Sequence, residues 1–257
     1  MSHQFAAAGR LDVELVAGGL VASRNQARQA IEAGRVVVNG VRARKASQLV
    51  SVGDRVEVEV EAWVSRASHK LLGALDDAQI SVPARCLDAG ASTGGFTQVL
   101  LSRGAEVVYA VDVGHGQLAS PIQGDPRVRA REGVNIKDLR LADLDGQPVR
   151  LAVADLSFIS LTLVLPALLP LIAADGDALV LVKPQFEVGR GHLGSSGVVR
   201  SDRLRQQAVD NVAAVAAGLG WGEVWRGQSC LPGAHGNIEW FIHLHALLSA
   251  MDDRLVE

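Results

Sequence analysis

Four ionisable residues stand at positions from which they could move protons together. Asp155 and Lys183 each come directly after a short apolar run that is typical of a buried strand, and Glu239 stands at the start of a later run. The carboxyl ends of parallel strands meet at one edge of a sheet, and an antiparallel strand begins at that same edge. Lys70 lies on a helical segment before the first of these strands. We therefore expect two lysines and two acids to converge on one crevice, an arrangement suited to general acid–base chemistry.

A glycine-rich segment lies ahead of these strand ends. Residues 88–96 read Asp-Ala-Gly-Ala-Ser-Thr-Gly-Gly-Phe, between a short apolar strand and a helix. Glycines in this place let the backbone approach a ligand closely, at the edge where open α/β sheets bind cofactors. Asp112 ends the next strand, where a carboxylate can accept hydrogen bonds from ribose hydroxyls. The pattern predicts a site for a nucleotide-like cofactor.

Two other interpretations of this segment compete. The dinucleotide-binding pattern G-x-G-x-x-G fails, because the glycines stand at 90, 94 and 95. Gly90-x-Ser92-x-Gly94 does match the nucleophile elbow of serine hydrolases, with Asp155 and His235 behind it in hydrolase order. This elbow would follow the first strand of its region, however, and no clear oxyanion-loop motif precedes it. A serine hydrolase that uses Ser92 stays open as an alternative.

The composition limits the classes of protein to consider. The chain has 257 residues, of which 48% are hydrophobic and 21% charged, values typical of one or two folded globular domains. Two cysteines and no signal pattern at the first Met predict a cytoplasmic protein with free thiols. The uncharged stretch 156–174 contains Pro166 and Pro170, which favours a buried strand end and helix over a membrane span. We expect no membrane partner.

The first 60 residues carry eight basic and six acidic residues, a net charge of +2, whereas the remainder carries −5. Apolar spacing and turn residues predict two helices followed by hairpin strands, with Ser23 as a helix cap and Asn39-Gly40 as a turn. Arg24 and Arg28 stand one helical turn apart and share a face. From charge alone, a solvated helix face is the simpler interpretation of these arginines.

The order of motifs in this segment resembles the S4 RNA-binding domain. The matching motifs are Arg10-Leu-Asp-x-x-Leu, Ser23-Arg24-x-x-Ala27-x-x-x-Ile31, Gly34-x-Val36-x-Val38-Asn39-Gly40 and Gly53-Asp54. The resemblance covers nearly all of residues 9–60. It implies that one face contacts the phosphates of structured RNA through Arg24, Arg28, Arg42, Arg44 and Lys45.

Beyond this segment the chain alternates strand and helix signals. We expect domains at 1–60 and 65–257 with a linker at 61–64. Strands are predicted at 86–89, 107–111, 151–154 and 178–182, and helices at 65–78, after Phe96, around 163–172 and at 202–218. Such alternation predicts an α/β fold with a mostly parallel, doubly wound sheet. Residues 238–244 are expected to add an antiparallel edge strand.

The glycine segment also resembles the loop of Rossmann-like methyltransferases that bind S-adenosylmethionine. The matching pattern is Asp-x-Gly-x-x-x-Gly-Gly-Phe at the first strand, with an acid at the end of the second. The resemblance implies that Gly90, Gly94 and Gly95 approach the amino-acid part of the cofactor, that Asp112 holds the ribose and that Asn135 lies near the adenine. The remaining implied cofactor-binding residues are Asp88, Ser92, Thr93, Phe96 and Asp155.

Lys70, Asp155, Lys183 and Glu239 match, in order and context, the catalytic tetrad of FtsJ-type ribose 2′-O-methyltransferases. With the S4-like segment in front, the whole chain is similar to the TlyA family, whose older name is hemolysin and whose members are understood as ribosomal RNA 2′-O-methyltransferases acting on cytidine. The motifs Asp155-Leu-Ser-Phe-Ile-Ser, Val182-Lys-Pro-Gln-Phe-Glu187 and Gly197-Val-Val-Arg200 strengthen the match. Glu61 departs from it, because an arginine often stands at this junction.

The resemblance implies S-adenosylmethionine as cofactor, ribosomal RNA within ribosomal subunits as partner and Lys183 as the general base. This chemistry needs no metal, and without a plausible third ligand His243-x-His245 is expected to be ordinary strand sequence. The Gly/Ser-rich segment 189–197 is either a connector or a lid that brings Arg190 and Arg200 near phosphates. A non-enzymatic RNA-binding or pore-forming protein is the other alternative.

Overall fold

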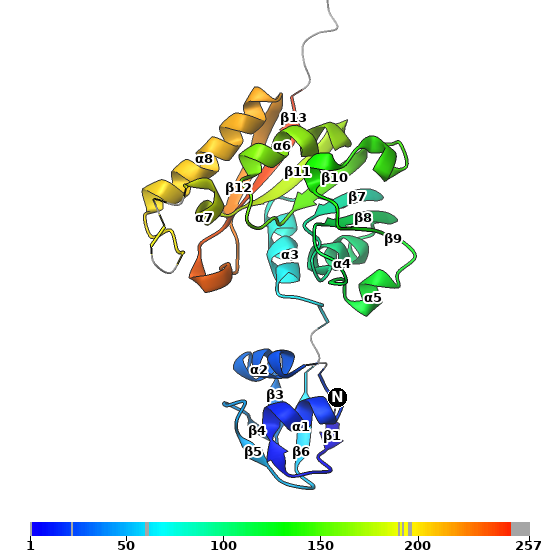
Figure 1. Cartoon of the computed structure of the whole chain (residues 1–257), viewed down its shortest axis with the longest axis vertical. Coiled ribbons are helices and arrows are strands. Elements are labelled where there is room, and N and C mark those ends of the chain that lie inside the picture. The colour runs from blue at the N-terminus through cyan, green and yellow to red at the C-terminus, as the bar shows by residue number, and fades with distance from the viewer. Residues whose placement is uncertain are drawn as a thin grey trace, which may run out of the picture. The chain divides into compact units, whose positions relative to one another are not determined.

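The computed structural model describes residues 2–21, 23–59, 62–189, 191, 193–194 and 197–247. It divides the chain into two compact units, Met1–Ala62 and Trp63–Glu257. We call them the N-terminal unit and the body (Figure 1).

The N-terminal unit contains two helices and short antiparallel strands. Its elements are β1 (Ser2–Gln4), β2 (Gly9–Arg10), α1 (Leu11–Ala17), α2 (Arg24–Glu32), β3 (Val36–Val38), β4 (Val41–Arg42), β5 (Leu49–Val50) and β6 (Arg55–Val58). The strands form a sheet in the order β1-β6-β3-β4 and a separate β2-β5 pair.

Local sequence signals account for these elements. The Ser23 side chain accepts a hydrogen bond from the backbone N–H of Gln26 and so caps α2. Asn39 and Gly40 both adopt positive φ, as the tight turn between β3 and β4 requires. The apolar faces of α1 and α2 pack on the valines of β3 and β6 to form one small core.

The body is built on a seven-stranded sheet among the residues described, in the order β12-β13-β11-β10-β7-β8-β9. All neighbouring strands are parallel except those that pair with β13. The strands are β7 (Arg85–Ala89), β8 (Val107–Asp112), β9 (Val128–Glu132), β10 (Val149–Ala154), β11 (Ile172–Val182), β12 (Trp221–Gln228) and β13 (Trp240–Ala246).

Helices cover both faces of this sheet (Figure 1). The α-helices are α3 (Ala67–Asp77), α4 (Gly95–Ser102), α5 (Ser120–Gln123), α6 (Leu161–Leu168), α7 (Pro184–Glu187) and α8 (Asp202–Gly218), and the 3-10 helices are η1 (Ile136–Asp138), η2 (Leu141–Leu144), η3 (Leu169–Leu171) and η5 (Ala234–Gly236). Alternate residues of each central strand enter different cores, one under α3 and α4 and the other under α6 and α8. The predicted α/β fold, with a small N-terminal domain in front of a mostly parallel sheet, is confirmed.

The predicted place of one strand and the predicted length of one helix were wrong. The strand expected at the edge, β13, lies between β11 and β12, and β12 forms the edge instead. In β12, two glycines, Glu223 and Arg226 stand between the apolar residues. Such a sequence suits an edge strand that is half exposed to solvent, but it lacks the continuous apolar run typical of a buried strand. The predicted helix around 163–172 also ran too long, since Ile172 already begins β11.

Candidate active site

A cavity of about 560 Å³ lies at the carboxyl ends of β7, β8 and β10, next to the loops that follow β7, β8, β9 and β10 in the chain. It is lined by residues 90 and 92, 111–113 and 117, 134–136, and 155–159. Four successive strand-to-helix connections thus contribute to one hollow. This is the edge of an open α/β sheet at which ligands bind.

The carboxylate of Asp112 organises one wall of this cavity. One of its oxygens accepts the backbone N–H of Ser92 at 2.8 Å, and the other accepts that of Gly114 at 2.7 Å. Each carboxylate oxygen has a second lone pair. Asp112 can therefore hold the glycine loop in place and still accept hydrogen bonds from a ribose.

Gly90 brings the glycine loop against the end of β10. Its φ is +88°, and a Cβ at this position would lie 2.6 Å from the carbonyl oxygen of Asp155. A side chain would force the two segments apart. Glycine is therefore needed here for Asp155 and the loop to share one cavity.

Several residues predicted to bind the cofactor do not line the cavity: Asp88, Thr93, Gly94, Gly95 and Phe96. A Cβ on Gly94 would press on Ile122, and one on Gly95 would press on Ser65. Phe96 is buried in the core beneath the sheet. The missing side chains at 94 and 95 thus make room for neighbouring protein atoms, and the approach of these glycines to the amino-acid part of a cofactor stays a prediction.

Asp88 supports the loop from inside the core. It is fully buried, and the Thr97 hydroxyl donates a 2.6 Å hydrogen bond to its carboxylate. Burial raises the pKa of Asp88 to about 7, and the nearby charges of Asp155 and Asp112 act in the same direction, whereas the Thr97 bond opposes them. Burying a carboxyl group whose pKa lies near pH 7 in the core costs folding free energy, whether the group is charged or protonated.

The four ionisable residues form two ion pairs. The Lys183 amine lies 2.6 Å from a carboxylate oxygen of Asp155, and the Lys70 amine lies 2.7 Å from one of Glu239. Both lysine side chains are only 11% exposed. Each positive charge is therefore largely withdrawn from water and fixed by one acid.

The sheet register explains why these residues meet. Val182 of β11 pairs with Trp240 of β13, so the next residues, Lys183 and Glu239, lie side by side at the same edge. Asp155 follows β10, the other neighbour of β11. The predicted convergence of the strand-end residues is thus a direct result of strand order.

Gly233 makes room for Glu239. A Cβ on Gly233 would overlap both carboxylate oxygens of Glu239, whose side chain is 2% exposed. The backbone N–H of Gly233 donates to the carbonyl oxygen of Asn237, which holds this loop in place. The loop therefore confines the Glu239 carboxylate beside Lys70.

The serine hydrolase alternative is not favoured by this geometry. The Ser92 hydroxyl hydrogen-bonds to Gln117 at 3.3 Å, and Asp155 is paired with Lys183. His235 is an exposed residue of η5. The acid that a catalytic triad would need is thus committed to a lysine.

Sequence reasoning missed part of the cavity wall. Leu156, Ser157, Phe158 and Ile159 line it, and so does Gln117. The Lys183 amine donates to the Ser157 hydroxyl at 2.9 Å. Phe158 has a positive φ of 65° and is 91% exposed. The sequence could have indicated residues 156–159, because they directly follow Asp155 and the end of β10 and so lie at the carboxyl edge of the sheet.

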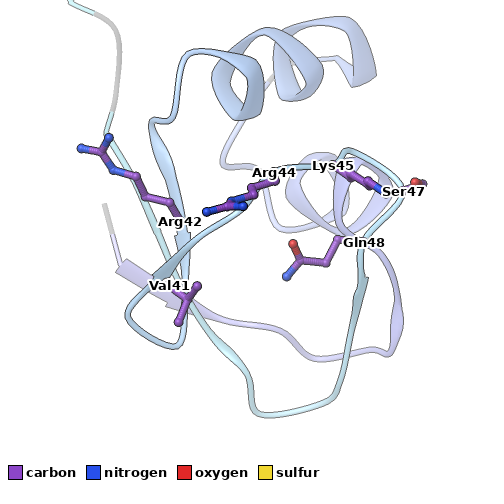
Figure 2. A pocket seen from close by; sticks show the side chains of 6 residues that line it. All are labelled: Val41, Arg42, Arg44, Lys45, Ser47 and Gln48. Carbon is purple, nitrogen blue, oxygen red and sulfur yellow. The ribbon is translucent and has the colours of Figure 1, made fainter.

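The basic residues predicted to meet RNA are exposed on the N-terminal unit. Arg28 lies on α2, and Figure 2 shows the side chains of Arg42, Arg44 and Lys45 around a cavity of about 470 Å³. Val41, Ser47 and Gln48 complete its lining. The cavity offers three cations and two neutral polar side chains to an anionic ligand.

Arg24 is also exposed, but unlike these cations it is paired with an acid. It forms a 2.8 Å ion pair with the buried Asp12, which also pairs with Arg10. Hydrogen bonds from the two arginines lower the pKa of Asp12 to about 2. Arg24 is thus held by an acid of α1. In the body, Arg200 is exposed, while Arg190 lies outside the described residues.

The two histidines of β13 have a shared partner. His243 and His245 each place one ring nitrogen within hydrogen-bond distance of the same Asp177 oxygen, at 2.8 and 2.9 Å. No group of three or more His, Cys, Asp or Glu side chains that could hold a metal occurs among the described residues. Within that part of the chain, no helix is both long and apolar enough to cross a membrane.

An open, mostly parallel sheet with a glycine loop after β7, an acid at the end of β8 and a cavity between them defines a Rossmann-like α/β protein of the kind that binds a cofactor at this edge. Known proteins narrow that class. Residues 63–246 match the FtsJ-like methyltransferase model, and residues 9–56 match the S4 domain model. The chain belongs to the FtsJ-like methyltransferase family and carries an S4 domain.

Individual relatives agree with this assignment. The chain is 51% identical to the 16S/23S rRNA (cytidine-2′-O)-methyltransferase TlyA of Mycobacterium tuberculosis, covering 91% of this chain and 89% of the relative. It is 39% identical to Hemolysin A of Brachyspira hyodysenteriae, covering 91% and 98%. A solved hemolysin structure from Streptococcus thermophilus, 38% identical, superposes with a TM-score of 0.74 over 95% of this chain and 90% of that one. The predicted TlyA-type resemblance is confirmed.

Proposed function

We propose that this protein methylates the ribose 2′-hydroxyl of a cytidine in ribosomal RNA, with S-adenosylmethionine as the methyl donor and ribosomal subunits in the cytoplasm as substrate. The observation that carries the proposal is the pair of lysine–acid ion pairs at the sheet edge where the cavity opens. The S4 domain and the names of the close relatives favour RNA as the substrate.

The residues around the cavity are suited to bind the methyl donor, S-adenosylmethionine. A cavity of about 560 Å³ suits a ligand of this size. Asp112 faces it with free lone pairs, and Gly90 lets the loop approach the ligand closely. Asn135 lines the wall on the β9 side, where an adenine would lie. S-adenosylmethionine, when bound, supplies an electrophilic methyl group.

The protein must then align a ribose hydroxyl and accept its proton. Lys183 is the proposed base, because its amine is only 11% exposed and contacts Asp155 and Ser157, which both line the cavity. Asp155 holds that amine in place at 2.6 Å. We assign a positioning role to Lys70 of α3 and to Glu239, which precedes β13. Their 2.7 Å ion pair fixes the part of the sheet edge next to Lys183.

The N-terminal unit would bring the RNA to the body. Arg28, Arg42, Arg44 and Lys45 are exposed, and each cation that contacts a phosphate releases condensed counterions. Such contacts read shape and backbone more than sequence. We therefore assign affinity to this unit and chemistry to the body.

The test is transfer of labelled methyl from S-adenosylmethionine to purified ribosomal subunits, followed by nuclease digestion and nucleoside analysis. We expect label in 2′-O-methylcytidine. Tight binding of subunits with no label in RNA would favour the non-enzymatic RNA-binding alternative, and label on a base would contradict the tetrad assignment.

A further inference from the structure

We infer that Glu187 is a positioning residue that holds the Lys183 segment against the Asp155 segment and so sets the geometry of the proposed base. This inference rests on the proposed function for its consequence in catalysis, but its structural part can be tested without activity. The relevant segments are 155–161, which leads from β10 into α6, and 183–187, which leads from β11 through α7.

Glu187 links these segments through both of its carboxylate oxygens. One oxygen accepts the hydroxyl of Ser160 at 2.5 Å, and the other accepts the backbone N–H of Leu161 at 2.8 Å. Ser160 caps α6, and a carboxylate at that helix end is favoured by the helix dipole. Glu187 therefore binds the start of α6 from a different strand connection.

The link closes a series of contacts that begins at the base. Lys183 meets Asp155 at 2.6 Å and Ser157 at 2.9 Å. Further along, the ring of Phe186 lies 5.4 Å from that of Phe158. Glu187 makes the last contacts of the series, so both ends of the two segments are tied together.

The Glu187 carboxylate is partly removed from water, which disfavours its charged form. Burial raises the pKa of Glu187, and the hydrogen bonds from Ser160 and Leu161 act in the opposite direction. A partly buried acid with two ordered donors has little freedom to move. α7 has only four residues, so a shift of Glu187 would be transmitted to Lys183 at its start.

The consequence for catalysis follows from the sensitivity of proton transfer to distance. A misplacement of about 1 Å can cost about a hundredfold in rate. We expect Glu187→Ala to lower the single-turnover methyl-transfer rate about tenfold to a hundredfold, with S-adenosylmethionine and RNA affinities within about twofold of wild type. Glu187→Gln should restore most of the rate, because its amide can accept from Leu161 and donate to the Ser160 oxygen.

Ser201→Ala is the matched control for a simple loss of helix capping. Ser201 caps α8 by accepting the N–H of Leu204, and it plays no part in the two segments. If Glu187 only stabilises α6, both alanine variants will lower the melting temperature while the rate at 25 °C stays at the wild-type value. That result would overturn the inference.

Amine labelling of Lys183 separates this inference from the proposed function. With a brief amine-reactive pulse and mass spectrometry, the exposed Lys137 serves as internal reference. Lys183 should label several-fold faster in Glu187→Ala than in wild type, Glu187→Gln or Ser201→Ala. Equal labelling in all four contradicts the positioning role even if methyl transfer is observed, and faster labelling supports it even if wild type transfers no methyl group.

Ser160→Ala provides a milder variant should Glu187→Ala fail to fold. It removes the hydroxyl contact and leaves the Leu161 bond to Glu187. Its rate and Lys183 labelling should lie between those of wild type and Glu187→Ala, and wild-type values for both would count against the inference.

Discussion

The two units use basic residues in opposite ways. In the body, Lys70 and Lys183 are each 11% exposed and each is paired with one acid. In the N-terminal unit, Arg28, Arg42 and Arg44 are exposed to solvent. Buried pairs have a defined geometry, whereas exposed cations attract any nearby phosphate. The comparison indicates that chemistry depends on order in the body and that affinity depends on charge in the N-terminal unit.

Energetics support this division. Burying an ion pair costs desolvation that its attraction barely offsets, so such a pair is weak evidence for stability. Removing one partner leaves a buried charge and is strongly unfavourable. The two lysine–acid pairs of the body are best explained by the geometry that they provide.

Among variants outside the four ionisable residues, Gly233→Ala should have the largest effect on the body. It changes no charge, but its methyl group would displace the Glu239 carboxylate from Lys70. We expect the single-turnover rate to fall about a hundredfold, within the range of acid–base contributions, with cofactor affinity unchanged. Gly218→Ala, whose added Cβ meets nothing within 4 Å, should keep the wild-type rate. A normal rate in Gly233→Ala would show that the Lys70–Glu239 pair is dispensable.

Asp112→Ala should have the next largest effect, a loss of affinity for S-adenosylmethionine. Hydrogen bonds to a charged group contribute about 1.5–3 kcal/mol, which corresponds to one to two decades in the affinity for S-adenosylmethionine. Calorimetric titration measures it, and Glu106→Ala, an exposed carboxylate of the body, is the control. Unchanged affinity in a folded variant would remove Asp112 from the cofactor site.

The N-terminal unit should respond to charge removal in a graded way. Replacing Arg28, Arg42 and Arg44 by alanine should weaken RNA binding and reduce the slope of log affinity against log salt by about 2 to 3. Cofactor affinity should not change. Arg103 and Arg150, which pair with Asp76 and Asp175 in the body, supply a control double variant. An unaltered slope in the triple variant would mean that this surface is only solvated.

The smallest effects concern two buried acids with opposite pKa shifts. The pKa of Asp88 is raised to about 7, so the folded state keeps a proton that the unfolded state has lost between about pH 4 and 7. Wild-type stability therefore falls as pH rises through that range. The melting temperature of Asp88→Asn relative to wild type should increase from pH 5 to pH 8, and a difference that does not vary with pH would contradict the shift.

Asp12 should show the reverse behaviour. Its pKa is lowered to about 2 by Arg10 and Arg24, so its stabilising contribution is present above about pH 4 and is lost as pH falls toward 2. Asp12→Asn should be less stable than wild type at pH 7, and thermal melts should show the gap closing below pH 4. A gap that persists at pH 2 would mean that the arginines stabilise the unit by packing alone.

Sequence patterns predicted the elements that have strong local signals. The helix 202–218, the Asn39-Gly40 turn and the strand ends at Asp155 and Lys183 depend on apolar periodicity and turn chemistry within a few residues. The β12 edge strand was missed, because a half-exposed strand with two glycines has no such periodicity.

The candidate site also contains residues that the sequence could predict and residues that it could not. The tetrad could be anticipated, because the topology of an α/β sheet brings strand ends together. The roles of Gly94, Gly95 and Gly233 could not, because each depends on which distant side chain fills the space of its missing Cβ. Glu187 was quoted in a family motif, but its bonds to Ser160 and Leu161 cross between two strand connections and leave no local pattern.

The most direct test of the account is the pH dependence of single-turnover methyl transfer, with RNA and S-adenosylmethionine both saturating. The wild-type rate should rise with pH, because only an unprotonated base can accept the proton of the ribose hydroxyl. Lys183→Ala and Lys183→Arg should both be nearly inactive and lack this rise, because a guanidinium stays protonated and cannot accept a proton. If Lys183→Arg keeps most of the wild-type rate and the same pH profile, Lys183 is not the base and alignment of the two substrates must account for catalysis.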